Sequence, residues 1–210
     1  MIVHSFSHRL QQLRFPYAAY MDRHKCIFIH IPRTGGSTIR TLLGAPVPGR
    51  MHLPWSIYRQ ANPKKFDDYF KFAFVRHPLE RVLSAYSYLL AGGNGKGDLA
   101  AAGLISQFGS FDTFVRDGLL NGTFLNHVLF VAQSYFVCDY SGAIKVDFLG
   151  RMASFGADCR EICSRLSLAR EVPHCNASRR EIGIGAKVNR EPKRIIEQIY
   201  HRDYVAFGYK

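Results

Sequence analysis

The chain has 210 residues, enough for one domain with a sizeable hydrophobic core. Hydrophobic residues make up 47% and charged residues 21% of it, a composition that excludes an intrinsically disordered protein. Lys and Arg outnumber Asp and Glu by 28 to 16, so the formal charge is +12. This excess either aids solubility alone or indicates an anionic partner: a nucleotide, a nucleic acid, an acidic glycan or a membrane surface.

The cysteines and the N-terminus bear on the compartment. The five cysteines show neither a CxxC pair nor a zinc-ligand spacing, so we expect reduced, mostly buried thiols and no metal site. The N-terminus lacks a signal-peptide apolar region, and no stretch reaches the roughly 18 apolar residues of a membrane helix. We expect a cytoplasmic protein if the chain is complete, or a Golgi-lumenal domain if an N-terminal anchor has been removed.

The first predicted elements are a strand, a loop and a helix. Residues 25–31 (KCIFIHI) form a short apolar run that ends before Pro32, which indicates a buried strand. The following RTGGST is a predicted loop, and STIRTLL a predicted helix with Ser37 or Thr38 as its cap. Residues 1–24 precede this unit, so we interpret them as an N-terminal extension of a single domain over 25–210.

The rest of the chain repeats this alternation of strands and helices. A second strand is predicted at 71–75, a helix at 79–90, a third strand at 144–149, and helices at 154–168 and 191–204. The Gly/Ala-rich stretch 91–103 is a predicted mobile loop that could gate an acceptor site. Strands that alternate with helices predict a three-layer α/β/α fold with a mainly parallel central sheet. In such sheets ligands bind at the carboxyl ends of the strands, here the loops 32–38 and 76–78.

The first of these loops has the features of an anion-binding loop. Gly35 and Gly36 allow the backbone to approach a phosphate closely, and the N–H groups at the start of the helix favour negative charge. Ser37 and Thr38 add hydroxyl donors, and Arg33 adds a permanent charge. A plain glycine turn before a capped helix is the alternative. The Walker A pattern G-x-x-x-x-G-K-[ST] is absent, which disfavours an ATPase or GTPase.

Two motifs resemble those of PAPS-dependent carbohydrate sulfotransferases, where PAPS is 3′-phosphoadenosine 5′-phosphosulfate. IPRTGGST is similar to the family's 5′-phosphosulfate loop, and FAFVRHPLERVLSAY to its 3′-phosphate motif, an Arg that closes a strand and a Ser eight residues later. The segments VDFLGRMASF, PHCNAS and DYVAFGY are also similar, so the resemblance covers about residues 25–208. It implies a P-loop-NTPase-like sulfotransferase fold.

The resemblance also implies how the donor is bound. Arg76 and Ser84 would hold the 3′-phosphate, Arg151 would lie near the adenosine, and the first loop would hold the phosphosulfate through Arg33, Thr34, Gly35, Gly36, Ser37 and Thr38. The family's usual Lys is Arg33 here, which keeps the charge but is bulkier. Arg33 would stabilise charge on the departing phosphate, and PAP, the desulfated nucleotide, would be the product. This scheme needs no metal.

The general base is the least specified part of the predicted site. His52, in GRMHLPW, corresponds to the region where related glycan O-sulfotransferases carry a catalytic His, and an imidazole suits base chemistry near neutral pH. His127 is the alternative. It resembles the start of the family's His-x(n)-Pro-Gln segment, whose Gln133 could contact the acceptor or satisfy buried backbone. Trp55 could stack on a sugar or only pack, and Arg179 and Arg180 could cover the nucleotide.

We therefore expect a sulfotransferase that acts on a hydroxyl of an acceptor, a carbohydrate and possibly an anionic glycan. A non-catalytic protein that binds PAPS or acidic glycans would keep both motifs and lose only the base. A nucleotide-dependent kinase is disfavoured by the missing Walker lysine. A nucleic-acid partner is disfavoured because no RNP, zinc-finger or basic-helix signature is present.

Overall fold

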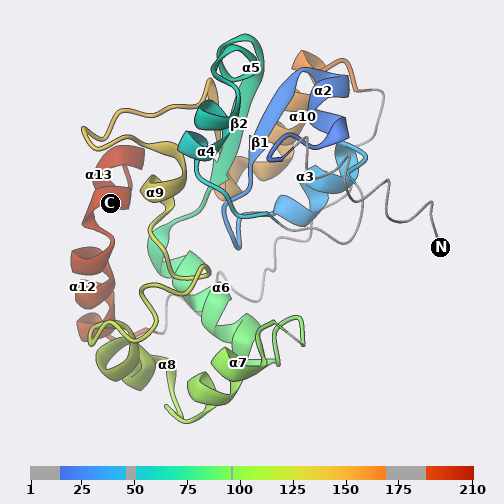
Figure 1. The fold of residues 1–210 in the computed structure, drawn as a ribbon. Coiled ribbons are helices and arrows are strands. Elements are labelled where there is room, and N and C mark those ends of the chain that lie inside the picture. Colours follow the sequence, from blue (N-terminus) through green and yellow to red (C-terminus); the bar gives the residue numbers. More distant parts are fainter. Residues whose placement is uncertain (1–14, 46–50, 96, 169–187) are drawn as a thin grey trace, which may run out of the picture. The chain divides into compact units, whose positions relative to one another are not determined.

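The computed structural model describes residues 15–45, 51–95, 97–168 and 188–210 (Figure 1). The chain forms two compact units. The sheet unit comprises Met1–Ile31, Gly35–Phe74 and Phe136–Cys175, and the helical unit comprises Pro32–Thr34, Val75–Tyr135 and Asn176–Lys210. The chain thus crosses between the units inside the predicted phosphate loop, after Ile31 and again after Thr34.

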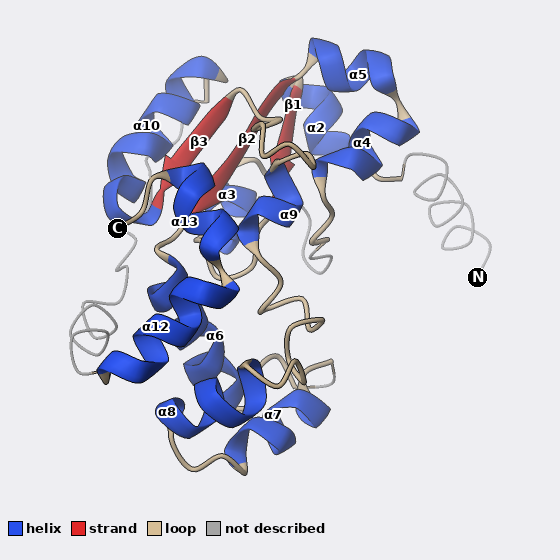
Figure 2. Cartoon of the chain, turned by 90° about the vertical axis from the view of Figure 1, so that its left-hand side faces the viewer, coloured by secondary structure: helices blue, strands red, loops and turns tan. Residues whose placement is uncertain are grey.

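The sheet unit is built on a three-stranded parallel sheet of order β1-β2-β3 (Figure 2). The strands are β1 (Cys26–Ile29), β2 (Phe70–Val75) and β3 (Phe148–Arg151). Cys26 lies opposite Phe70 and Ile29 opposite Ala73. All four residues of β1 are buried, as the near-continuous apolar sequence of a strand covered on both faces requires. The predicted α/β class is therefore confirmed.

Helices connect and flank these strands. They are α2 (Ala19–His24), α3 (Gly36–Leu42), α4 (Trp55–Ala61), α5 (Pro63–Asp68) and α10 (Phe155–Arg165), the last preceded by a 3-10 turn at Met152–Ser154. Helix α2 packs on β1 and buries Tyr20 and Met21, and Tyr17 just before it is also buried, so residues before β1 add to the core of this unit. Whether residues 1–24 form an extension remains a prediction.

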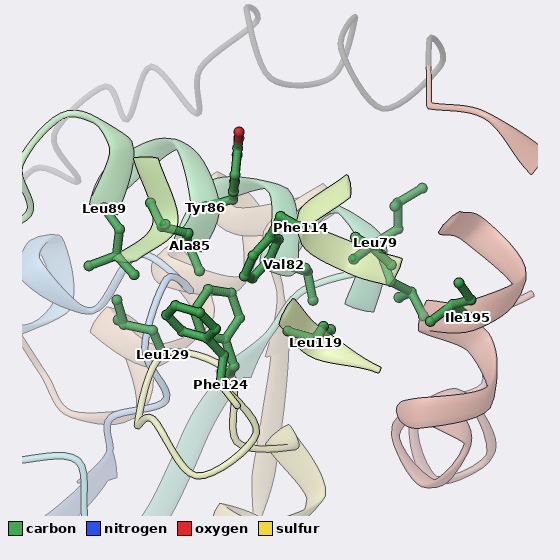
Figure 3. Close-up of a cluster of buried hydrophobic side chains, with 14 of the residues drawn as sticks. Leu79, Val82, Ala85, Tyr86, Leu89, Phe114, Leu119, Phe124, Leu129 and Ile195 are labelled. Carbon is green, nitrogen blue, oxygen red and sulfur yellow. The ribbon is translucent and has the colours of Figure 1, made fainter. Parts of the chain in front are cut away.

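The helical unit consists of α6 (Pro78–Leu90), α7 (Leu99–Ser106), α8 (Phe111–Thr113), a π-helical segment (Phe114–Leu119), α12 (Arg190–Ile199) and α13 (His201–Phe207). Figure 3 shows its core, where the rings of Phe114 and Phe124 meet edge to face at 5.3 Å between centroids. Leu79, Val82 and Ile195 pack around them. Helix α9 (Gln133–Val137) begins in the helical unit and ends in the sheet unit.

Several predicted boundaries were wrong. The third strand begins at Phe148, not at 144, because Ile144 instead forms an isolated antiparallel bridge with Cys138. The end of the predicted loop 91–103, from Leu99 onward, belongs to α7, which buries Ala101 and Ile105 in the core. The final helix is interrupted at Tyr200, whose buried hydroxyl donates to the Phe130 carbonyl at 2.7 Å. Tertiary packing therefore overrides the local signal at each place.

Four cysteines, Cys26, Cys138, Cys159 and Cys163, are buried and carry thiols, not disulfides, and Cys175 lies outside the described residues. Burial raises the pKa of the Cys26 thiol to about 12, so this thiol is protonated and unreactive at neutral pH. Across the described ranges, no helix has both the length and the apolar character needed to cross a bilayer.

Candidate active site

The predicted phosphate loop contains two residues in the left-handed backbone region. Gly35 has φ 76° and Arg33 has φ 68°. A non-glycine residue pays about 1–2 kcal/mol for this conformation, and such strain is concentrated at functional sites. Helix α3 starts directly after Gly35 and has no side-chain cap, so the expected capping by Ser37 or Thr38 was wrong.

Gly35 is also required by packing inside the sheet unit. A Cβ built on it would lie 2.5 Å from the ring of Phe155 and 3.3 Å from the sulfur of Met152. The backbone of the loop therefore lies against the start of α10 with no room for a side chain. The unusual dihedrals expected from the sequence are found at Gly35, whereas the expected close approach to a phosphate stays a prediction.

Within the helical unit, Arg33 is held by two residues of α6. Its Nε and Nη2 both donate to Ser84 Oγ, at 3.1 and 2.9 Å, and its guanidinium lies 4.6 Å from the centroid of the Tyr88 ring. Ser84 and Tyr88 are four residues apart and therefore share one face of the helix. The sequence analysis missed Tyr88, although this spacing from Ser84 could have indicated it.

These contacts leave a clear chemical role for Ser84. A hydroxyl has two acceptor lone pairs and one donor hydrogen. The two bonds from Arg33 use its acceptor side, whereas a phosphate oxygen would require its hydrogen as donor. Ser84 therefore orients the Arg33 guanidinium through the acceptor side of its hydroxyl oxygen.

Arg76 follows β2 directly and is only 8% exposed. Its Nε pairs with Glu80 Oε2 at 3.3 Å, one turn along the chain in α6. Its backbone N–H donates to Gln133 Oε1 at 2.9 Å, and its carbonyl accepts from Gln133 Nε2 at 2.8 Å. A guanidinium in so sheltered a place interacts with an anion more strongly than one in open water.

His52 lies beside His30 in the sheet unit. Its Nδ1 is 2.8 Å from the His30 carbonyl oxygen, and the two rings are 4.4 Å apart between centroids. A carbonyl only accepts, so Nδ1 carries the hydrogen, and Nε2 of the neutral ring has the lone pair that could take a proton. The hydrogen bond thus fixes the tautomer that a general base needs.

His30 in turn packs against the start of α3. A Cβ built on Gly36 would lie 1.9 Å from His30 Nε2 and 2.0 Å from its Cδ2. The His30 imidazole is buried and contacts both this helix and the His52 ring, so its packing restricts rotation of the side chain. Because Gly36 has no side chain, the His30 ring can contact both the start of α3 and His52, the candidate base, within one unit.

The Gly36→Ala variant is expected to lose about 1–3 kcal/mol of stability because of this overpacking. In a His30→Ala background the ring is absent, and the same substitution should be close to neutral. Urea unfolding of the four proteins of this double-mutant cycle measures the coupling. An equal cost of Gly36→Ala in both backgrounds would show that contact with His30 is not the cause.

The two other candidates in the helical unit differ in exposure. Gln133 is fully buried and bonds to backbone, the second of the roles considered for it. His127 is half-buried, and its Nδ1 accepts from the Leu129 N–H at 3.4 Å. Burial lowers the pKa of the His127 imidazole below its ordinary value, an effect that the Asp98 charge opposes. A lowered pKa favours the neutral form of the ring, and His127 remains the alternative base.

Trp55 is used for packing. Its Nε1 donates to the Cys138 carbonyl at 3.0 Å, and Lys145 Nζ lies 5.7 Å from its ring centroid. The backbone N–H of Arg151 donates to Asp158 Oδ2 at 2.6 Å, which anchors the turn after β3. Arg179 and Arg180 lie outside the described residues. Within the described part of the chain, no three His, Cys, Asp or Glu side chains gather as a metal site would require.

An Arg thus follows a parallel strand, a Ser lies eight residues later on the next helix, and the Arg of a strained loop donates to that Ser. A family model described as the sulfotransferase family matches residues 51–210, more than half of the chain. The chain therefore belongs to the sulfotransferase family. The matched range includes Arg76, Ser84 and His52, whereas the loop 33–38 precedes it. No curated protein and no solved structure matches the chain.

Proposed function

We propose that this member of the family transfers a sulfuryl group from PAPS to a hydroxyl of a carbohydrate acceptor. The observation that carries the proposal is the pair of hydrogen bonds from Arg33 to Ser84. These residues belong to two motifs that the sequence indicates separately, one for each anionic end of PAPS, and they lie 51 positions apart. Their contact supports a common ligand for the two motifs.

The residues then have distinct tasks. Arg76 and Ser84 bind the 3′-phosphate, and the loop from Arg33 to Thr38 binds the phosphosulfate. His52 Nε2 takes the proton of the acceptor hydroxyl as its oxygen bonds to sulfur and the bond from sulfur to the 5′-phosphate oxygen breaks. Arg33 stabilises the negative charge that this cleavage leaves on PAP.

Binding of PAP, compared with ADP, tests the donor assignment. We expect calorimetry to show a preference for PAP, because only PAP offers a 3′-phosphate to Arg76. Arg76→Ala should weaken PAP binding about 10- to 100-fold, the usual value of a charge-assisted hydrogen-bonded contact, and leave ADP binding unchanged.

Arg59→Ala is the matched control, since it removes the same charge from an exposed position on α4. This control should change neither affinity by more than about twofold at physiological salt, where exposed charges are screened. Equal binding of PAP and ADP by the unaltered protein would contradict a PAPS donor site.

A further inference from the structure

A fully buried carboxylate lies in the helical unit at a place that no step of the reaction uses. Asp203, on α13, has no exposed surface. Its Oδ2 accepts the backbone N–H of Gln133 at 2.8 Å, and its Oδ1 accepts that of Ser134, also at 2.8 Å. Burial of a carboxylate is costly unless hydrogen bonds compensate it, so this network calls for an explanation in terms of what it holds in place.

The side chain of Gln133 extends the network by one step. Its Nε2 donates to Asp203 Oδ2 at 3.3 Å and to the Arg76 carbonyl at 2.8 Å, and its Oε1 accepts the Arg76 N–H at 2.9 Å. A carboxylate and a carbonyl can only accept, so the amide of Gln133 has one permitted orientation. Asp203 thus stabilises the same amide orientation that the Arg76 backbone groups require.

The two hydrogen bonds between the Gln133 amide and the Arg76 backbone resemble a pair of hydrogen bonds between neighbouring strands of a sheet. Residue 76 is where β2 ends and the chain turns towards α6, and Gln133 satisfies both of its backbone groups there. With its backbone held at two points, Arg76 has a fixed Cα–Cβ direction from which its side chain extends. The side chain of Arg76 also pairs with Glu80, which lies in the same unit.

We propose that Asp203 is a positioning residue for the donor site: it orients Gln133, which holds the backbone of Arg76 so that the guanidinium faces the 3′-phosphate. This inference rests on the proposed binding of that phosphate by Arg76. Asp203 itself touches no substrate. Its effect should therefore appear as a loss of discrimination for the 3′-phosphate, not as a general loss of nucleotide binding.

The test uses Asp203→Asn, which keeps the size of the side chain but removes its charge and one acceptor oxygen. PAP affinity should fall about tenfold while ADP affinity stays constant, because only the contact with the 3′-phosphate is disturbed. In an Arg76→Ala background the same substitution should cause no further loss of PAP affinity. Asp139→Asn is the control: Asp139 also accepts two backbone N–H groups, those of Ser141 and Ala143.

Gln133→Met provides a second variant, with similar volume and none of these side-chain hydrogen bonds, and should show the same selective loss of PAP affinity. Equal weakening of PAP and ADP, an additive effect in the Arg76→Ala background, or failure of both variants to fold by circular dichroism would overturn the positioning role.

Hydrogen exchange at the Arg76 amide separates this inference from the proposed function. The amide should be protected in the unaltered protein and lose protection in Asp203→Asn, whichever nucleotide the protein binds. If the unaltered protein does not prefer PAP but this change in exchange is seen, the donor assignment fails and the positional link from Asp203 to Arg76 stands. Unchanged protection in Asp203→Asn would refute that link.

Discussion

His52→Asn is expected to lower kcat for sulfuryl transfer about 10²- to 10⁴-fold, the usual contribution of a positioned general base. The asparagine amide can still donate to the His30 carbonyl, as His52 Nδ1 does now, but it cannot take a proton from the acceptor. The variant therefore removes the proposed chemistry and keeps the contact. Initial rates with labelled PAPS and an acceptor that supports turnover would measure the change.

His127→Asn is the matched comparison, because His127 is the alternative base. We expect this variant to retain kcat within about threefold, since a residue outside the chemistry contributes little to the barrier. PAP affinity should be unchanged in both variants. The reverse ranking of the two variants would assign the base to His127. Full activity in both, or absence of transfer by the unaltered protein while it still binds PAP, would favour the non-catalytic binder.

Elements with strong local signals were predictable from the sequence. The apolar run before Pro32 and the run before Arg76 became the parallel pair β1 and β2, and helical spacing gave α6 almost to the residue. These segments are buried along most of their length, so their own hydrophobic pattern is enough to predict them. The loops at their carboxyl ends were predictable for the same reason.

The connections between distant residues were not predictable. Asp203 and Gln133 are 70 positions apart, and no local pattern indicates that a helix near the end of the chain caps α9. The contact of His30 with Gly36 depends on a side-chain direction that strand alternation does not give. Register and packing decide such contacts, which is also why the third strand was displaced by four residues from its predicted start.

The second large effect is expected for Arg33→Ala. This substitution removes the charge that the proposal places on the departing phosphate, and loss of one such contact typically lowers kcat about 10²- to 10³-fold. Arg33→Lys keeps the charge and is the residue usual in the family that the loop resembles. A lysine cannot reproduce the two donors that converge on Ser84 Oγ, so we expect an intermediate loss of about tenfold.

Variants of Tyr88 separate the effect of losing the Arg33 charge from the effect of changing the orientation of the Arg33 side chain. Tyr88→Phe keeps the ring beneath the Arg33 guanidinium and removes only a hydroxyl that bonds to Asp98, so kcat should stay within about twofold. Tyr88→Ala removes the ring and should lower kcat less than Arg33→Ala does, because Ser84 still holds the guanidinium. If Arg33→Ala and Arg33→Lys lose the same activity, charge is not what Arg33 contributes. A charge-based role requires Arg33→Lys to remain clearly the more active of the two.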